Sequence, residues 1–140
     1  MRNTLLKVLV MVISGIFGYA VVSSVFDLRH AKTPLDVRLA RVAANMNQQL
    51  PLMADPETRL DKVTAGPGSQ LTYAFTLPNQ DKSALDLPAF EKIIRQNLIN
   101  NYKTNGSMDE LRASQVKLAY QYKDKNGDFI SEIVVTPKDF

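Results

Sequence analysis

Hydrophobic and polar residues alternate without interruption from Gln70 to Leu77, and this pattern predicts a strand with one buried face. Leu71, Tyr73 and Phe75 fall on the buried face, and polar or small residues separate them. A shift of one residue in strand register would turn the whole apolar set outward. The pattern therefore predicts which side of this strand faces the core.

Two other segments carry apolar residues at steps of three and four, which is the period of an amphipathic helix. In the first, we expect Thr33 as the N-cap and Pro34 as the first helical residue, and Pro51 ends the helix. The second helix begins near Asp86 and ends at Gly106. The apolar stripes are Leu35, Leu39, Val42, Met46 and Leu50 in the first helix, and Phe90, Ile93, Ile94, Leu98 and Tyr102 in the second.

Near the C-terminal end, two apolar segments flank Asn126-Gly127, a dipeptide that suits a two-residue type I′ hairpin turn. With that turn, the numbers of paired residues sum to 253, so that Tyr120 faces Ile133. The same register places Phe129 on the apolar face. The two strands of this hairpin are predicted over residues 115–123 and 129–136.

With a weaker strand over residues 58–65, the soluble part of the chain has the order α-β-β-α-β-β. We expect an α+β fold: a four-stranded antiparallel sheet with two helices packed on one face, preceded by an N-terminal transmembrane helix. The predicted domains are a transmembrane anchor over residues 1–28, a juxtamembrane linker over 29–33 and a single soluble domain over 34–140.

The predicted anchor rests on Val8–Phe26, nineteen residues without a charge. As a helix they span about 28 Å, close to the hydrocarbon core of a bilayer. Gly18-Tyr19-Ala20 would also serve as a signal-peptide cleavage site, but the apolar run continues to Phe26, which favours an uncleaved anchor. We therefore expect a single-pass inner-membrane protein with a cytoplasmic N-terminus and a periplasmic domain. The alternative is a cleaved protein in the periplasm.

Ser14 and Gly18 form one small-xxx-small step, which predicts a place where a second membrane helix could pack closely. A homo-oligomer is compatible with such a contact. Beyond Phe26 the chain has fifteen Lys and Arg residues against fourteen Asp and Glu residues, without a basic block. Nucleic-acid binding needs a clustered positive face, so this class of partner is not expected.

Catalytic chemistry finds little support in the sequence. There is no cysteine, and His30 is the only histidine, so a histidine-based triad or a multi-histidine metal site cannot form within one chain. We predict no metal and no cofactor. A carboxylate-dependent hydrolase is the remaining enzymatic alternative, although no pair of acids is marked by the sequence.

Two surfaces are candidates for binding a partner protein. On the predicted helix-free face of the sheet, aliphatic side chains lie among charged ones, and a contiguous apolar patch there would indicate an interface. The segment after Pro51 adds two acidic residues. The candidate residues are Ala74, Ala119, Ile130 and Val134 on the sheet and Asp55 and Glu57 in the segment after Pro51.

Short motifs spread over most of the soluble domain resemble a group of small exported or membrane-anchored bacterial proteins of uncharacterised function. These motifs are Leu50-Pro51, Asp55, Thr58-Arg59-Leu60-Asp61, Leu71-Thr72-Tyr73 and Asn126-Gly127. The resemblance implies export. Members of the group often carry a cysteine pair, and this chain departs from the pattern with Lys103 and Phe140 near those places.

The sequence thus favours a non-enzymatic protein of the cell envelope whose periplasmic domain binds other envelope proteins, as an accessory subunit of a membrane assembly. Its partners would be the lipid bilayer, through Val8–Phe26, and an envelope protein. An inhibitor or immunity-type protein that protects the envelope is a second hypothesis.

Overall fold

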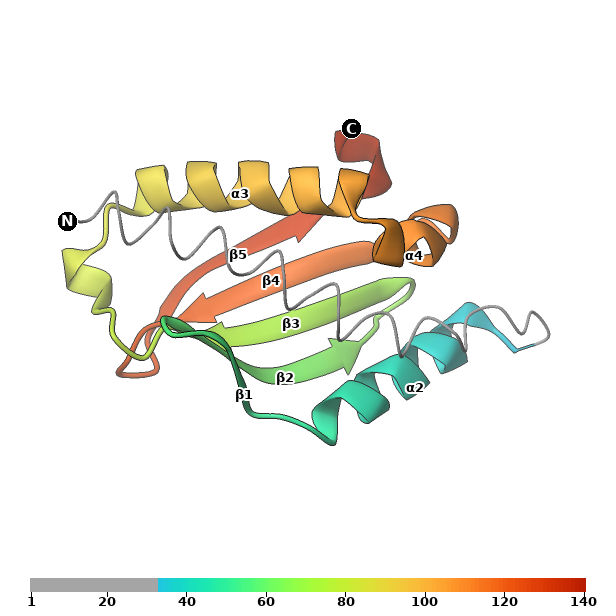
Figure 1. Cartoon of the computed structure of the whole chain (residues 1–140), viewed down its shortest axis with the longest axis horizontal. Helices are drawn as coiled ribbons and strands as arrows, with labels where there is room; N and C mark the ends of the chain where they lie inside the picture. The colour runs from blue at the N-terminus through green and yellow to red at the C-terminus, as the bar shows by residue number, and fades with distance from the viewer. Residues whose placement is uncertain (1–32) are drawn as a thin grey trace.

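The central element of the structure, a computed structural model that describes residues 33–140, is one five-stranded sheet. The strands lie side by side in chain order, from β1 at one edge to β5 at the other (Figure 1). The strands are β1 (Leu52–Asp55), β2 (Thr58–Ala65), β3 (Gln70–Thr76), β4 (Lys117–Lys123) and β5 (Phe129–Val135). The α-helices are α2 (Leu35–Asn47), α3 (Leu87–Thr104) and α4 (Asp109–Ala113), and the 3₁₀ turns are η2 (Lys82–Ala84), η3 (Gly106–Met108) and η4 (Pro137–Asp139).

The predicted four-stranded antiparallel sheet is wrong in two respects. First, β3 and β4 are parallel neighbours, with Tyr73 beside Tyr120, so the sheet is mixed. The connection through α3 explains the parallel direction. A crossover helix returns the chain to the end of the sheet at which β3 begins, so β4 starts from that same end.

Second, the sheet has a fifth strand, β1, that pairs antiparallel with β2. Its four residues directly follow Pro51 and show no alternation, which is why the sequence pattern does not reveal it. β1 covers only one end of β2. Farther along, the Asn47 side chain donates to the Val63 carbonyl and accepts from the Val63 N–H, both at 2.8 Å. This amide satisfies backbone groups of β2 where no neighbouring strand does so.

The β4–β5 turn is not the predicted type I′ turn. Among residues 33–140, Gln115 is the one non-glycine residue with a positive φ, so Asn126 lacks the conformation that a type I′ turn requires. Instead, the Asp124 N–H donates to the Asp128 carbonyl at 2.9 Å, and the Gly127 N–H donates to the Asp124 carbonyl at 3.0 Å. Gly127 has φ +83°, which fits a three-residue loop that ends in a glycine bulge.

A second irregularity restores the predicted register farther along the hairpin. Lys123 pairs with Phe129, but Tyr122 pairs with Ser131, so Ile130 is an extra residue on β5. From there the predicted pairing holds, with Tyr120 opposite Ile133. The bulge leaves Phe129 52% exposed, so its predicted position on the apolar face is wrong.

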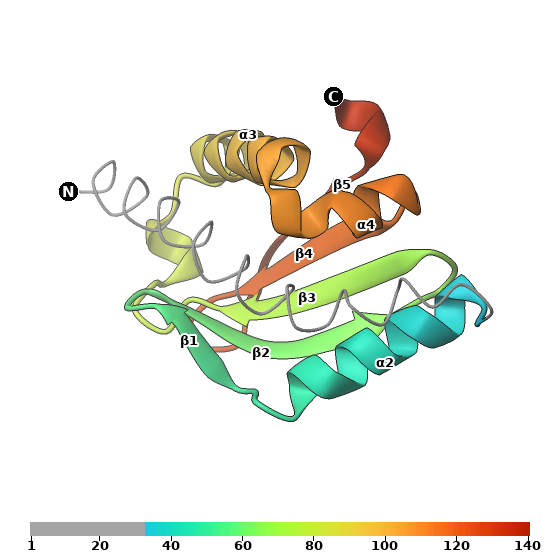
Figure 2. The same cartoon turned by 45° about the vertical axis from the view of Figure 1, so that its right-hand side comes forward.

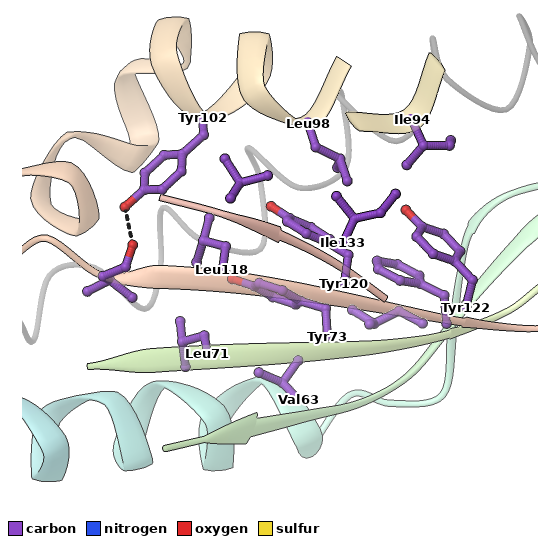
Figure 3. Close-up of a cluster of buried hydrophobic side chains, with 14 of the residues drawn as sticks. Val63, Leu71, Tyr73, Ile94, Leu98, Tyr102, Leu118, Tyr120, Tyr122 and Ile133 are labelled. Atoms are coloured by element: carbon purple, nitrogen blue, oxygen red, sulfur yellow. Dashed lines mark hydrogen bonds between the residues drawn. The ribbon is translucent and has the colours of Figure 1, made fainter. Parts of the chain in front are cut away.

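Both long helices lie over the same face of the sheet, α2 along β2 and α3 along β5 (Figures 1 and 2). Between them, aromatic side chains of β3 and β4 stack at centroid distances of 5.3 Å for Tyr73 with Tyr120 and 5.2 Å for Phe75 with Tyr122. Figure 3 shows this core together with the buried hydrogen bond from the Tyr102 hydroxyl to the Val116 carbonyl, at 2.7 Å. One continuous core therefore joins the helices to the sheet.

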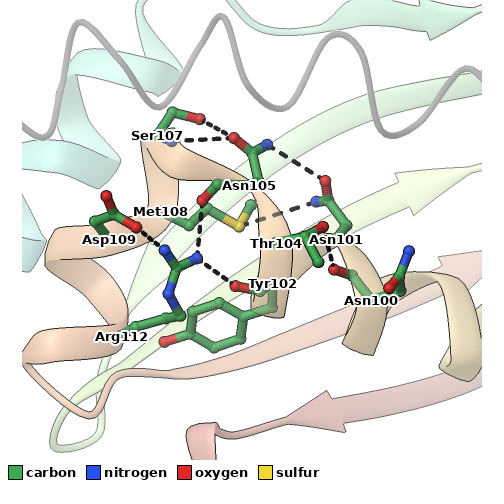
Figure 4. A network of polar contacts seen from close by, with 9 residues as sticks. All are labelled: Asn100, Asn101, Tyr102, Thr104, Asn105, Ser107, Met108, Asp109 and Arg112. Carbon is green, nitrogen blue, oxygen red and sulfur yellow. Dashed lines mark hydrogen bonds and ion pairs between the residues drawn. The ribbon is translucent and has the colours of Figure 1, made fainter. Parts of the chain in front are cut away.

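The ends of α3 are fixed by side chains. Asp86 caps the start by accepting from the Ala89 N–H, close to the predicted position. At the C-terminal end, Arg112 donates to the Tyr102 and Asn105 carbonyls, at 2.6 and 2.8 Å, and pairs with Asp109 (Figure 4). A cation that donates to terminal carbonyls stabilises a helix end. By contrast, α2 begins after Pro34, and the expected cap from Thr33 is not formed.

No helix within residues 33–140 has both the length and the apolar character needed to cross a membrane. The predicted anchor Val8–Phe26, with Ser14 and Gly18, lies outside the described residues. The prediction of an N-terminal transmembrane helix in a single-pass inner-membrane protein thus has no support in the structure, and we do not retain it. The predicted domain boundaries stay predictions.

Candidate partner-binding surface

The face of the sheet opposite α2 and α3 carries most of the apolar residues predicted to bind a partner. Two rows of side chains cross β3, β4 and β5 there, because the register aligns neighbouring strands. We call these six residues the open sheet face: Thr72, Ala119 and Val134 in one row, and Ala74, Gln121 and Glu132 in the next. The structure thus brings Ala74, Ala119 and Val134 together, as predicted.

The open sheet face has small side chains in the middle and polar ones toward β5. Ala119 is fully covered by its neighbours, and Thr72, Ala74 and Val134 are half-buried. Gln121 donates to Glu132 across β4 and β5 at 2.7 Å. Small side chains let another backbone or side chain approach a sheet closely, so the centre of this face can accept a flat partner surface.

Lysines surround the open sheet face. Lys62 pairs with Ala74 across β2 and β3, and Lys117 and Lys123 stand at opposite ends of β4, all three exposed. Arg59 is paired with Asp61, whose second carboxylate oxygen accepts from Thr76. The sequence alone does not bring Thr72 and Lys62 into this surface, because their places depend on the strand order and on the parallel pairing of β3 with β4.

Ile130 does not belong to the open sheet face. It is the extra residue of the β5 bulge, is 5% exposed and forms part of the core. Strict alternation from Val134 would have placed it beside Ala119 and Val134 on the helix-free side, but the bulge interrupts that alternation.

The two acidic candidates, Asp55 and Glu57, lie at the turn between β1 and β2 and do not belong to the open sheet face. Glu57 is half-buried, and its carboxylate accepts from the Asn79 side chain at 3.1 Å. Asp55 is 5% exposed, and one of its carboxylate oxygens accepts from the Glu57 N–H at 2.7 Å. Asp55 therefore shapes the turn and is not available to a partner in this conformation.

Asp55 lies in a buried polar cluster with Thr58, which pairs with it across the turn, and Tyr122 of β4. Burial raises the pKa of the Asp55 carboxyl, partly opposed by hydrogen bonds from Glu57 and Thr58. Burial likewise raises the pKa of the Tyr122 hydroxyl, and the nearby Asp55 charge adds to that effect.

A second buried carboxylate, Asp124, connects two loops. Its oxygens accept from three backbone N–H groups: Asn126 at 2.8 Å, Asp128 at 2.9 Å and Lys82 at 2.9 Å. The hydrogen bond from Lys82 is the main cause that lowers the pKa of Asp124. With all of these donors in place, Asp124 has a structural role. Within residues 33–140, no three His, Cys, Asp or Glu side chains gather in a way that could hold a metal ion.

No protein-family model matches this sequence, and no curated protein matches it at the sequence level. Solved structures, by contrast, share its fold. The pilotin EpsS of the type 2 secretion system of Vibrio vulnificus superimposes with a TM-score of 0.60 and 10% identity, over 74% of this chain and 89% of that protein.

Two other solved structures are similar. The type II secretion system pilotin AspS of Vibrio cholerae matches with a TM-score of 0.56 and 14% identity, over 76% of this chain and 92% of its own. A Pseudomonas aeruginosa protein classed as secreted matches with a TM-score of 0.59 and 16% identity, over 75% and 95% of the two chains. At these identities the likeness concerns the fold. The described domain has the fold of these pilotins.

Proposed function

We propose that this protein is a non-enzymatic accessory protein of a cell-envelope assembly and that it acts by binding a protein partner. The observation that carries the proposal is the shared fold: two of the similar structures are pilotins of a type II secretion system, and the match covers about nine-tenths of each. Fold alone does not imply function, so the proposal also needs a surface on this chain that can bind.

The open sheet face is the surface we assign to the partner. Its centre consists of small or half-buried side chains, and the exposed lysines Lys62, Lys117 and Lys123 lie at its margins. An interface with an apolar centre and a polar rim is the usual arrangement of protein–protein contacts. The lysines favour a partner with acidic residues around a flat apolar patch.

The role as an enzyme is disfavoured by the chemistry of the buried acids. The Asp124 carboxylate accepts from backbone donors, and the neighbouring carboxylates of Asp55 and Glu57 accept hydrogen bonds that shape the β1–β2 turn. A hydrolase of the two-carboxylate type needs a pair of acids on either side of the scissile bond. The resemblance to small exported proteins and the similarity to the Pseudomonas aeruginosa protein that is classed as secreted both support a location in the cell envelope.

Affinity capture tests the proposal. The full chain, tagged and expressed in the organism that encodes it, would be cross-linked in intact cells and purified. We expect an envelope-assembly subunit to co-purify in near-equal amount. The Ala74→Glu variant places a new charge in the centre of the open sheet face and should reduce the captured partner at least about tenfold.

The matched control is Gln96→Glu, which adds the same charge to an exposed position of α3 on the other side of the sheet. It should capture the partner as well as the original protein does. Recovery of this chain alone from cross-linked cells would refute the proposed function. Equal capture of a partner by both variants would support partner binding but would show that the partner does not bind to the open sheet face.

A further inference from the structure

The edge strand β1 is held weakly compared with the other strands. It contributes four residues to the sheet, and its pairing with β2 is interrupted by a bulge between Met53 and Asp55. Leu52 and Met53 are each 44% exposed. A short, irregular edge strand with few buried contacts opens at lower free energy than the rest of a domain. Its attachment therefore depends on the turn that follows it.

Three buried polar side chains lie together at that turn, two from the turn itself and one from β4. Asp55 is 5% exposed, and Thr58 and Tyr122 are fully buried. The Asp55 Oδ1 atom accepts from the Glu57 N–H, Thr58 is the other donor beside the carboxylate, and Tyr122 Oη has no hydrogen-bond partner among the described residues. Buried polar atoms without partners are rare in folded proteins and costly.

The two protonation states of Asp55 differ in how well this environment suits them. Burial disfavours the ionised carboxylate, and the hydrogen bonds from Glu57 and Thr58 offset that effect only in part. A neutral carboxyl keeps the bond from the Glu57 N–H at little cost and can offer its own proton to a neighbouring hydroxyl oxygen.

The surrounding groups do not supply a compensating positive charge. The titratable groups that act on Asp55 are Glu57 in the same turn and Tyr122 on β4, and neither is a cation. Arg59, the next residue along β2, is paired with Asp61. The burial that raises the pKa of Asp55 is therefore not offset by a salt bridge.

We propose that Asp55, Thr58 and Tyr122 form a pH-sensitive clasp that holds β1 against β2 in mild acid and releases it as the pH rises. In acid, the neutral Asp55 keeps the turn closed. When Asp55 ionises, opening of the turn lets water reach the carboxylate, and β1 leaves the edge of β2 at Leu60. This inference does not depend on the proposed partner.

The direction follows from linkage between proton binding and stability. A carboxyl whose pKa is higher in the folded state binds more protons there than in the opened state. The stability that it contributes is complete below the ordinary pKa of Asp, 3.8, and is lost as the pH rises through the raised value. Each unit of elevation corresponds to about a tenfold change in the opening equilibrium.

Hydrogen exchange measured by NMR on the full chain tests the clasp. Protection factors of β1 and of the facing end of β2, taken relative to β4, should fall about tenfold or more between about pH 4 and about pH 8. Asp55→Asn keeps the acceptor for the Glu57 N–H and cannot ionise, so its protection should stay high and flat. Glu57→Gln, which removes the neighbouring carboxylate, should retain the fall in protection.

A second measurement tests the clasp even if Asp55→Asn fails to fold. The ¹³Cγ resonance of Asp55 in the unaltered protein should titrate above the ordinary value of 3.8, in parallel with the loss of β1 protection. A titration midpoint at or below that value would overturn the clasp. So would β1 protection that is the same at both pH values, or a pH-dependent loss of protection that persists in Asp55→Asn.

Discussion

Phe75→Ala is expected to cost about 3–5 kcal/mol of unfolding free energy, a large part of the roughly 5–15 kcal/mol available to a small domain. Phe75 is 1% exposed near the C-terminal end of β3 and stacks against Tyr122 at 5.2 Å and Tyr120 at 6.4 Å. Alanine would leave a cavity on the core face of the sheet, beside aromatic rings that are themselves closely packed and cannot collapse freely. Urea unfolding followed by circular dichroism measures the loss.

The same substitution at Phe129 is the control. Phe129 is 52% exposed after the β5 bulge, so Phe129→Ala should change the unfolding free energy by no more than about 0.5 kcal/mol. An uninterrupted two-residue hairpin would instead place Phe129 on the core face. Equal destabilisation by the two variants would therefore contradict both the bulge and the three-residue turn.

The second large effect is expected at Asp124, because one side chain holds two loops together. Asp124→Ala removes the acceptor for the Lys82, Asn126 and Asp128 N–H groups at once. Hydrogen bonds to a charged acceptor are stronger than neutral ones. We expect the thermal midpoint to fall by about 5–10 °C. Asp128→Ala, at an exposed acid of the same turn, should shift it by much less.

The pH dependence of this effect has the opposite sign to that at Asp55. The pKa of Asp124 is lowered in the folded state, so the stability it contributes is present above the ordinary Asp value and lost as the pH falls through the lowered one. The difference in thermal midpoint between the original protein and Asp124→Ala should therefore shrink below about pH 3.8. A difference that is unchanged or larger in acid would show that Asp124 acts by other means than its charge.

Local periodicity predicted the parts of the fold in which side chains alternate or repeat. The alternation through Tyr73 gave the core face of β3, and the apolar stripes gave α2 and α3. The pairing of Tyr120 with Ile133 was predicted correctly from a turn that proved wrong, because the extra Ile130 compensates for the extra loop residue. The missed loop residue and the missed bulge residue each shift the register by one, and the two shifts cancel.

The relative direction of β3 and β4 and the presence of the edge strand β1 could not be predicted from side-chain periodicity. Nothing in the alternation of β3 and β4 distinguishes a parallel from an antiparallel pair, since both present every second side chain to the core. That choice is made by the long connection through α3. β1 was missed because its pairing is short and bulged, so no period of two develops.

The candidate site was predictable to the same extent. Ala119 and Val134 were placed together by the hairpin register, and Ala74 joined them because β3 lies beside β4. Ile130 was misplaced because it is the extra residue of the β5 bulge, where the alternation of the strand is interrupted. Asp55 looked like an exposed turn acid, and only the position of Tyr122 on a strand far away in sequence shows it to be buried.

Site-specific photo-cross-linking tests whether a partner protein binds to the open sheet face. A photoreactive benzoylphenylalanine would replace Ala74 in one form of the full chain and Gln96 in another, each expressed in intact cells. We expect a cross-link from position 74 to an envelope-assembly protein and none from position 96. A cross-link from position 96 alone, or no cross-link from position 74 to any protein but this chain, would contradict it.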